Sequence, residues 1–142
     1  MTTTNSSEFA NFAAAPRVTL DPGKWYGKLR VFEATVPLAS QASGDIVNLF
    51  SLPKGFRPLF GMLNSDTSLG SATAAIGIAA TTGKYRAAAT FTATGTPTLF
   101  GVTAAVNGDA LAADETAILT IAAATLPASG TLKVLILGTG QE

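Results

Sequence analysis

Residues 128–137 have the sequence ASGTLKVLIL, which joins a turn signal to a strand signal. The Ala-Ser-Gly start is typical of a turn, and the residues after it alternate in polarity. Leu132, Val134 and Ile136 share one face of an extended strand, while Lys133 points to the reverse face. The stretch therefore predicts a β-strand that is buried on one side.

The same unit of a turn followed by a strand recurs along the whole chain. The turn signals are Pro22-Gly23, Ser43-Gly44, Pro53-Lys54-Gly55, Ser65-Asp66, Thr82-Gly83, Gly95-Thr96-Pro97, Asn107-Gly108-Asp109 and Ala128-Ser129-Gly130. Their spacing leaves room for strands and not for helices of ordinary length. The strand candidates are residues 28–38, 45–52, 57–64, 72–80, 85–92, 98–106, 116–124 and 131–137.

This pattern predicts an all-β fold of about eight strands. Because no long helical run separates the strands, parallel crossovers are improbable, and the sheets should be antiparallel. We expect an antiparallel β-sandwich, jelly-roll-like, with an extended N-terminal arm.

The phase of alternation is irregular in residues 29–36. Leu29 and Val31 point one way, while Phe32 and Val36 point the other. A β-bulge near Val31 would reconcile the two halves of this strand.

Residues 45–52 alternate more regularly. We expect Ile46, Phe50 and Leu52 to share one face, with Asn48 between them.

Alanine is common in three of the strand candidates, at residues 72–80, 85–89 and 121–124. Helix is the competing assignment there, because alanine is a poor strand former. We favour strand, since Gly77 interrupts the first run and threonines accompany the other two. Small side chains would let another backbone approach closely, and a compositional bias of the genome explains them equally well.

The residue types exclude most enzyme chemistry. The chain has no histidine and no cysteine, so it has no thiolate metal site, no cysteine nucleophile and no histidine base for a serine. The Gly83-Lys84 pair lacks the other residues of a phosphate-binding loop, and Asp114 and Glu115 would face opposite sides of a strand. We therefore predict no catalytic residue, no cofactor and no metal site.

Charge and hydropathy indicate a protein that associates. Nine basic and nine acidic residues balance to a formal net charge of zero, so no long-range field attracts free nucleic acid. No apolar run approaches the length of a membrane-spanning helix. Because 47% of the residues are hydrophobic and 13% are charged, we expect the exposed apolar surface to be covered by other subunits.

The first 24 residues differ from the rest, so we divide the chain into an arm (1–24) and a sandwich domain (25–142). A serine at position 6 or 7 would cap a short helix that places Phe9 and Phe12 on one side, and Pro16 would end it. An isolated helix of this length is unstable in water. The arm either lies on a neighbouring subunit, with Phe9 and Phe12 as anchors, or folds back on its own domain.

Trp25 and Tyr26 form an aromatic pair flanked by Lys24 and Lys28. If exposed, the pair could stack on a sugar ring; if buried, it would close one end of the sandwich. We favour packing, and keep Trp25 and Tyr26 as the candidate ligand-stacking residues.

Several segments carry a resemblance to a known class of protein. They are Phe50-Ser51-Leu52-Pro53-Lys54-Gly55-Phe56-Arg57-Pro58-Leu59-Phe60-Gly61, Ser65-Asp66-Thr67-Ser68-Leu69-Gly70-Ser71-Ala72-Thr73, Ile76-Gly77, Gly83-Lys84-Tyr85-Arg86-Ala87-Ala88 and Leu126-Pro127-Ala128-Ser129-Gly130-Thr131-Leu132. Together they resemble small virion proteins of tailed bacteriophages and prophages. The resemblance extends over roughly residues 27–138.

The resemblance implies a capsid decoration or cement protein, often a homotrimer, which binds the major capsid protein on the outer surface of the virion after synthesis in the host bacterial cytoplasm. In that role Arg57 and Arg86 are candidate contacts to carboxylates of a partner, although each also fits an ordinary strand residue. The alternative function is a carbohydrate- or host-surface-binding β-module of a phage spike or fibre.

Overall fold

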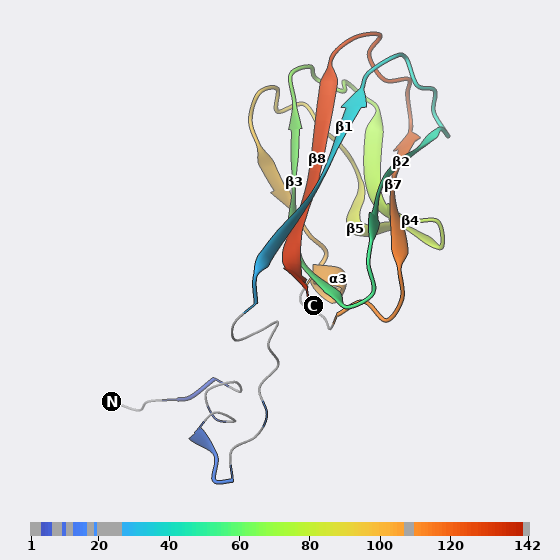
Figure 1. Ribbon diagram of the computed structural model, residues 1–142. Helices are drawn as coiled ribbons and strands as arrows, with labels where there is room; N and C mark the ends of the chain where they lie inside the picture. Colours follow the sequence, from blue (N-terminus) through green and yellow to red (C-terminus); the bar gives the residue numbers. More distant parts are fainter. Residues whose placement is uncertain are drawn as a thin grey trace.

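The computed structural model describes residues 4–6, 10, 13–16, 19, 27–106 and 110–140. Between residues 27 and 140 the described part of the chain holds eight strands and one short helix, and the fold is all-β (Figure 1). In chain order these are β1 (Leu29–Pro37), β2 (Ile46–Leu52), β3 (Phe56–Ser65), β4 (Thr73–Ile78), β5 (Thr81–Thr90), β6 (Thr98–Phe100), α3 (Thr103–Val106), β7 (Glu115–Ala122) and β8 (Thr131–Gly140).

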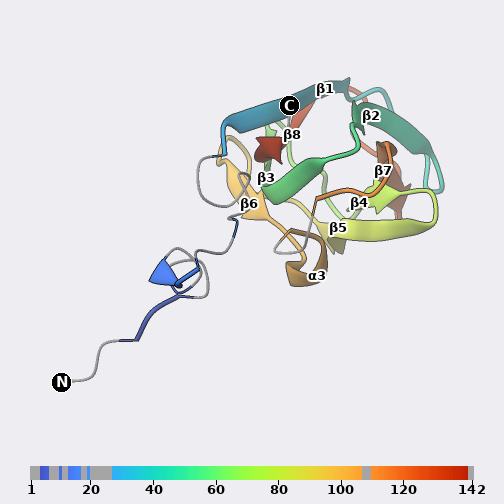
Figure 2. The same cartoon turned by 60° about the horizontal axis from the view of Figure 1, so that its bottom comes forward.

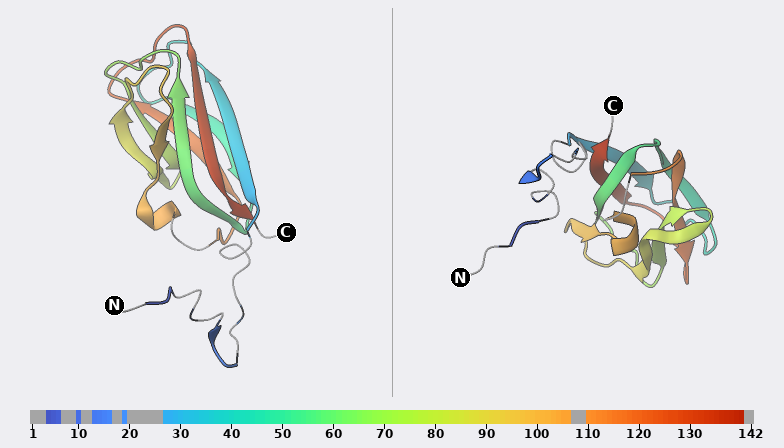
Figure 3. Two further views of the ribbon diagram at one scale, coloured as in Figure 1. Left: turned by 90° about the vertical axis from the view of Figure 1, so that its left-hand side faces the viewer. Right: turned by 90° about the horizontal axis from the view of Figure 1, so that it is seen from below.

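The strands form two four-stranded antiparallel sheets that pack face to face (Figures 2 and 3). Sheet A has the order β1-β8-β3-β6, and sheet B has the order β2-β7-β4-β5. Within sheet B, β4 and β5 are consecutive in the chain, whereas every other connection crosses from one sheet to the other. This order is that of a jelly roll, so the predicted antiparallel β-sandwich is confirmed.

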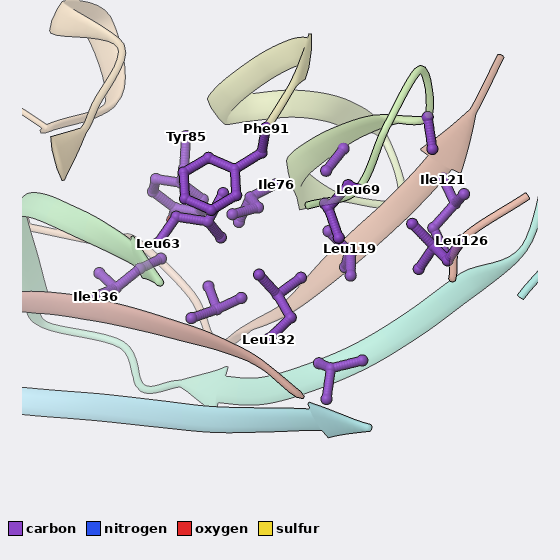
Figure 4. Packing of buried hydrophobic residues seen from close by; sticks show 14 of the residues in the cluster. Leu63, Leu69, Ile76, Tyr85, Phe91, Leu119, Ile121, Leu126, Leu132 and Ile136 are labelled. Atoms are coloured by element: carbon purple, nitrogen blue, oxygen red, sulfur yellow. The ribbon is translucent and has the colours of Figure 1, made fainter. Parts of the chain in front are cut away.

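The hydrophobic core lies between the two sheets (Figure 4). The inner face of sheet A contributes Phe56, Leu63, Leu132, Val134 and Ile136, and sheet B contributes Leu52, Ile76, Tyr85, Leu119 and Ile121. Each of these side chains is at most 1% exposed. The alternation predicted for residues 131–137 is thereby confirmed.

The connection from β2 to β3 is the turn that the Pro-Lys-Gly signal predicts. The Phe56 amide donates to the carbonyl oxygen of Pro53 over 3.1 Å. Gly55 has a φ of +86°, a left-handed conformation that side chains other than glycine rarely adopt. A tight turn here lets the chain cross between the sheets in a few residues.

The predicted bulge near Val31 is wrong. Strand β1 pairs with β8 in unbroken register from Leu29 to Pro37. Leu29 and Val31 face outward and are 59% and 52% exposed, while Phe32 points toward the core. The strand carries apolar side chains on both faces. The alternation rule mistakes this pattern for a change of phase.

A bulge is present in the neighbouring strand β2 instead. The register between β2 and β7 shifts between Asn48 and Phe50. Ile46 is 58% exposed, whereas Val47 and Phe50 pack against the core. The expectation that Ile46 shares a face with Phe50 is therefore wrong, because the bulge reverses the alternation between them.

Two strand boundaries also differ from the sequence prediction. Strand β5 begins at Thr81, four residues early, and β6 ends at Phe100. Residues 103–106, which we expected to be strand, form helix α3. Two alanines in this four-residue segment favour a helical turn there.

Small residues do allow a close approach inside the sandwich, at Gly77 of β4. A Cβ at this position would lie 2.6 Å from the carbonyl oxygen of Thr82 and 2.7 Å from the amide nitrogen of Lys84. The start of β5 therefore folds directly over Gly77, and the β4–β5 register shifts twice. The alanine-rich candidates 72–80 and 85–89 are strands β4 and β5, as expected.

Little of the predicted arm belongs to the described residues. The Ala10 amide donates to the carbonyl oxygen of Ser6 over 2.9 Å, which is the hydrogen bond of a helical turn. The division into an arm (1–24) and a sandwich domain (25–142) stays a prediction.

Truncation of Ile76 should test the two-layer core. Ile76 is fully buried and Ile46 is 58% exposed, so Ile76→Ala and Ile46→Ala remove the same atoms from opposite environments. We expect Ile76→Ala to lower the free energy of unfolding by about 2–5 kcal/mol, because it leaves a cavity. Ile46→Ala should change it by about 0.5 kcal/mol or less. Urea denaturation followed by circular dichroism measures both, and equal losses would contradict the assigned core.

Candidate interaction surface

The outer face of sheet A carries apolar side chains across all four of its strands. Residues directly opposite each other in neighbouring strands share a face. Val31, Leu137 and Phe60 form one such row across β1, β8 and β3. The next row contains Leu135, Met62 and Leu99, across β8, β3 and β6. We call these six residues the apolar stripe.

The apolar stripe is accessible to a partner. Leu99 is 67% exposed, Val31 is 52% exposed and Phe60 is 36% exposed. Strands β1 and β6 are the edges of sheet A, where natural proteins commonly place charged side chains. An exposed apolar surface that reaches both edges of a sheet marks an interaction site.

Two residues of opposite charge lie at one side of the stripe. Glu33 lies in the row of Leu135, and its carboxylate is 3.0 Å from the Lys133 ammonium. Both side chains are about half exposed, at 46% and 49%, so the pair contributes little to stability. The two charges cancel on this side of the stripe.

Arg57 borders the apolar stripe. It is half-buried on β3 and pairs with Thr139 of β8, which in turn pairs with Leu29 of β1. This row adjoins the row that contains Phe60. Contact between Arg57 and a partner carboxylate stays a prediction, and its position beside an exposed apolar face suits that role.

Arg86 lies in the other sheet and binds its own backbone. Its guanidinium donates to the carbonyl oxygens of Ala74, Ala89 and Thr90, the last two at 3.1 and 3.2 Å. Burial lowers the pKa of Arg86 from its ordinary value. The side chain thus fastens the irregular end of β5 to β4, and the structure does not bring Arg57 and Arg86 together. Contact between Arg86 and a partner carboxylate stays a prediction.

Lys84, Tyr85 and Glu115 form a polar cluster at one end of sheet B. The Lys84 ammonium is 2.5 Å from one Glu115 oxygen, and the Tyr85 hydroxyl donates to the other over 2.8 Å. Burial raises the pKa of Tyr85, and the hydrogen bond and negative charge of Glu115 raise it further. Lys84 and Tyr85 both bind the Glu115 carboxylate. The Lys84 ammonium is therefore paired with a carboxylate, unlike a lysine that is positioned to bind phosphate.

A shallow hollow of about 370 Å³ adjoins this cluster. It is lined by Ile78, Lys84, Val102 and Ala105, among others. The lining is mainly apolar, and the Lys84 ammonium within it is already paired with Glu115. The hollow therefore offers few polar groups that could orient a small substrate.

The described residues contain neither a metal site nor a membrane-spanning helix. Among them, no three His, Cys, Asp or Glu residues lie together in a group that could hold a metal ion. No helix in the same part of the chain is long and apolar enough to cross a membrane.

Four of the predicted site residues lie outside the described part of the chain. They are Phe9 and Phe12, the expected anchors of the arm, and Trp25 and Tyr26, the expected stacking pair. Their roles stay predictions.

Sequence reasoning missed the apolar stripe, although a signal for it was present. Leu29 and Val31 alternate with Phe32 and Val36, so apolar residues occupy both faces of β1. Such a strand is typical of a sheet that is covered on both sides. The alternation rule alone predicts a bulge in such a strand and so misses the second apolar face.

Solved structures with the same fold come from phage capsids. A chain in the cyanophage Pam1 capsid asymmetric unit is 19% identical and matches with a TM-score of 0.70 over 99% of this chain and 100% of that one. A chain in the capsid of Ralstonia phage GP4 is also 19% identical, with a TM-score of 0.62 over 82% and 87%. A chain in the acid-stable capsid of Helicobacter pylori bacteriophage KHP30 is 13% identical, with a TM-score of 0.55 over 77% and 86%.

At these levels of identity the likeness shows a shared fold. No family model matches the sequence, and no curated protein is significantly similar to it.

Replacement of Tyr85 should alter the response of the fold to alkali. An unfolded tyrosine ionises near pH 10, whereas burial keeps the folded Tyr85 neutral to higher pH. The unfolded state therefore loses its proton first, and the stability that Tyr85 contributes is complete below about pH 10 and falls as the pH rises further. Tyr85→Phe should lower the free energy of unfolding by about 1 kcal/mol at neutral pH.

Above about pH 10, the Tyr85→Phe variant should lose stability less steeply than the parent protein. Urea midpoints measured from neutral pH to about pH 11 check both effects. Parallel curves for the two proteins would show that Tyr85 ionises equally in the folded and unfolded states.

Proposed function

We propose that this protein is a structural protein of a phage virion, and specifically a decoration, or cement, protein. It binds the outside of the head and stabilises contacts between major capsid subunits. One observation carries this proposal: the jelly roll matches a chain of the cyanophage Pam1 capsid over nearly the full length of both chains. The proposed place of action is the outer surface of the virion, after synthesis in the host bacterial cytoplasm.

The physical demands of this role suit the described residues. A head filled with DNA is under outward pressure, and a clamp across several subunits adds buried area where the shell would otherwise separate. Such a clamp needs a stiff body and an apolar surface through which its copies hold together. The two-layer core supplies the first and the apolar stripe supplies the second. We propose that the protein acts by contact, without catalysis.

The proposed clamp has two kinds of contact. The arm, residues 1–24, extends onto a neighbouring subunit through Phe9 and Phe12, while Arg57 and Arg86 meet carboxylates of a partner. The sandwich domain, residues 25–142, associates with further copies as a homotrimer. A formal net charge of zero leaves the copies without mutual repulsion.

Binding to empty heads tests the function directly. Heads that lack this protein are mixed with the purified protein and sedimented, and the same protein is passed over immobilised glycans. We expect saturable co-sedimentation with the heads and no retention on the glycans. Retention on glycans without head binding would contradict the decoration role and favour a receptor-binding module.

Replacement of the two arm phenylalanines tests the arm. A Phe9→Ala/Phe12→Ala variant should bind heads at least about tenfold more weakly, because burying a phenylalanine contributes about 1.5–3 kcal/mol. The matched control is Thr3→Ala/Thr4→Ala, which changes polar residues of the same segment. Equal binding by both variants would show that the arm does not anchor the protein to the head.

A further inference from the structure

We propose that copies of this chain associate with one another through the apolar stripe of sheet A. The stripe is Val31, Phe60, Met62, Leu99, Leu135 and Leu137, which lie in two adjacent rows across the sheet. The inference rests on the self-association included in the proposed function, and it names the surface and the occupant of that contact.

The composition of the stripe favours a permanent partner. Interfaces between partners that also exist apart are about as apolar as the rest of the surface, whereas homomeric interfaces are more apolar. Within the two rows that form the stripe, the one charged side chain is Glu33, which is paired with Lys133. Other copies of the chain are present while the protein is being synthesised. One of them can therefore cover the apolar stripe soon after the chain folds.

The charges around the stripe permit contact between identical copies. The chain has no net charge, so two copies approach without long-range repulsion. Glu33 and Lys133 also carry opposite charges at adjacent rows, and each remains about half exposed. Facing copies can therefore set a carboxylate of one against an ammonium of the other at the rim.

The size of the face fits a specific interface. Strands β1, β8 and β3 have nine or ten residues each, and β6 has three. With strands about 4.8 Å apart and a rise of about 3.3 Å per residue, the face covers roughly 500–600 Å². A standard interface buries about 800 Å² on each partner, so a copy that covers the whole outer face of sheet A reaches about two-thirds of that area.

The stripe extends to both edges of sheet A. Val31 lies on edge strand β1 and Leu99 on edge strand β6, and both are more than half exposed. A facing copy can therefore cover the outer face across its full width.

Charge substitutions within the stripe test the inference. The test variant is Val31→Lys/Leu99→Lys, and the matched control is Ile46→Lys/Ala88→Lys, which places the same two charges at exposed positions on the two edge strands of sheet B. Sedimentation equilibrium gives the mass. We expect the parent protein and the control to be oligomers of equal mass. The double variant should be a monomer, with a dissociation constant raised at least about 100-fold by charges placed in an apolar interface.

An oligomeric double variant would overturn the stripe as the interface and leave self-association standing. A monomeric parent protein would overturn both. If the double variant dissociates while the parent oligomer fails to bind heads, the stripe is supported and the decoration role is contradicted.

A second measurement does not depend on disrupting the contact. The chain has no cysteine, so Val31→Cys and Ile46→Cys each introduce a single thiol. We expect the Val31→Cys thiol to be protected from alkylation at concentrations that favour the oligomer and to react after dilution. The Ile46→Cys thiol should react under both conditions. Equal reactivity of the two thiols in the oligomer would overturn the inference.

Discussion

Every strand of a β-sandwich has two faces. Exposure of a continuous apolar surface to water is unfavourable on either face. Here the inner faces are covered because sheets A and B pack on each other, and side chains such as Leu63 and Leu119 are almost completely buried. The outer face of sheet A has no such cover within the described part of the chain, and Val31 and Leu99 are exposed. An exposed apolar face of this kind is typical of a surface that another molecule covers.

The sequence predicted the architecture because its signals are local. Period-two alternation in β8 and the Pro-Lys-Gly turn before β3 each depend on a few adjacent residues, and all eight strands are present. The errors arose where the outcome depends on distant residues. The β2 bulge reflects its pairing with β7, and residues 103–106 turn into a helix next to β5 and β3. Alanine content alone did not separate residues 103–106 from β4, where the neighbouring strands impose extension.

The candidate surface was harder to predict than the fold. Arg57 was identified by its place in a segment of characteristic sequence, and it proves to border the apolar stripe. Lys84 and Arg86 are obvious candidates for binding a partner, because the chain has few charges. In the structure, Lys84 pairs with Glu115 and Arg86 donates to backbone carbonyls. These partners are close only because β5 folds over Gly77 and β7 lies beside β4. Spacing along the sequence does not reveal that these two side chains already have partners within the chain.

The position of β8 has a consequence for biosynthesis. This strand lies between β1 and β3 in sheet A, although it follows both in the chain and is the last of the eight to leave the ribosome. Until it arrives, β1 and β3 have no common neighbour, and the contacts that complete the sheet are among the most distant in sequence. A nascent chain that still lacks β8 leaves β1 and one edge of β3 unpaired, and unpaired strand edges of this kind are prone to aggregate. Translation of the last described strand therefore completes sheet A and removes this hazard.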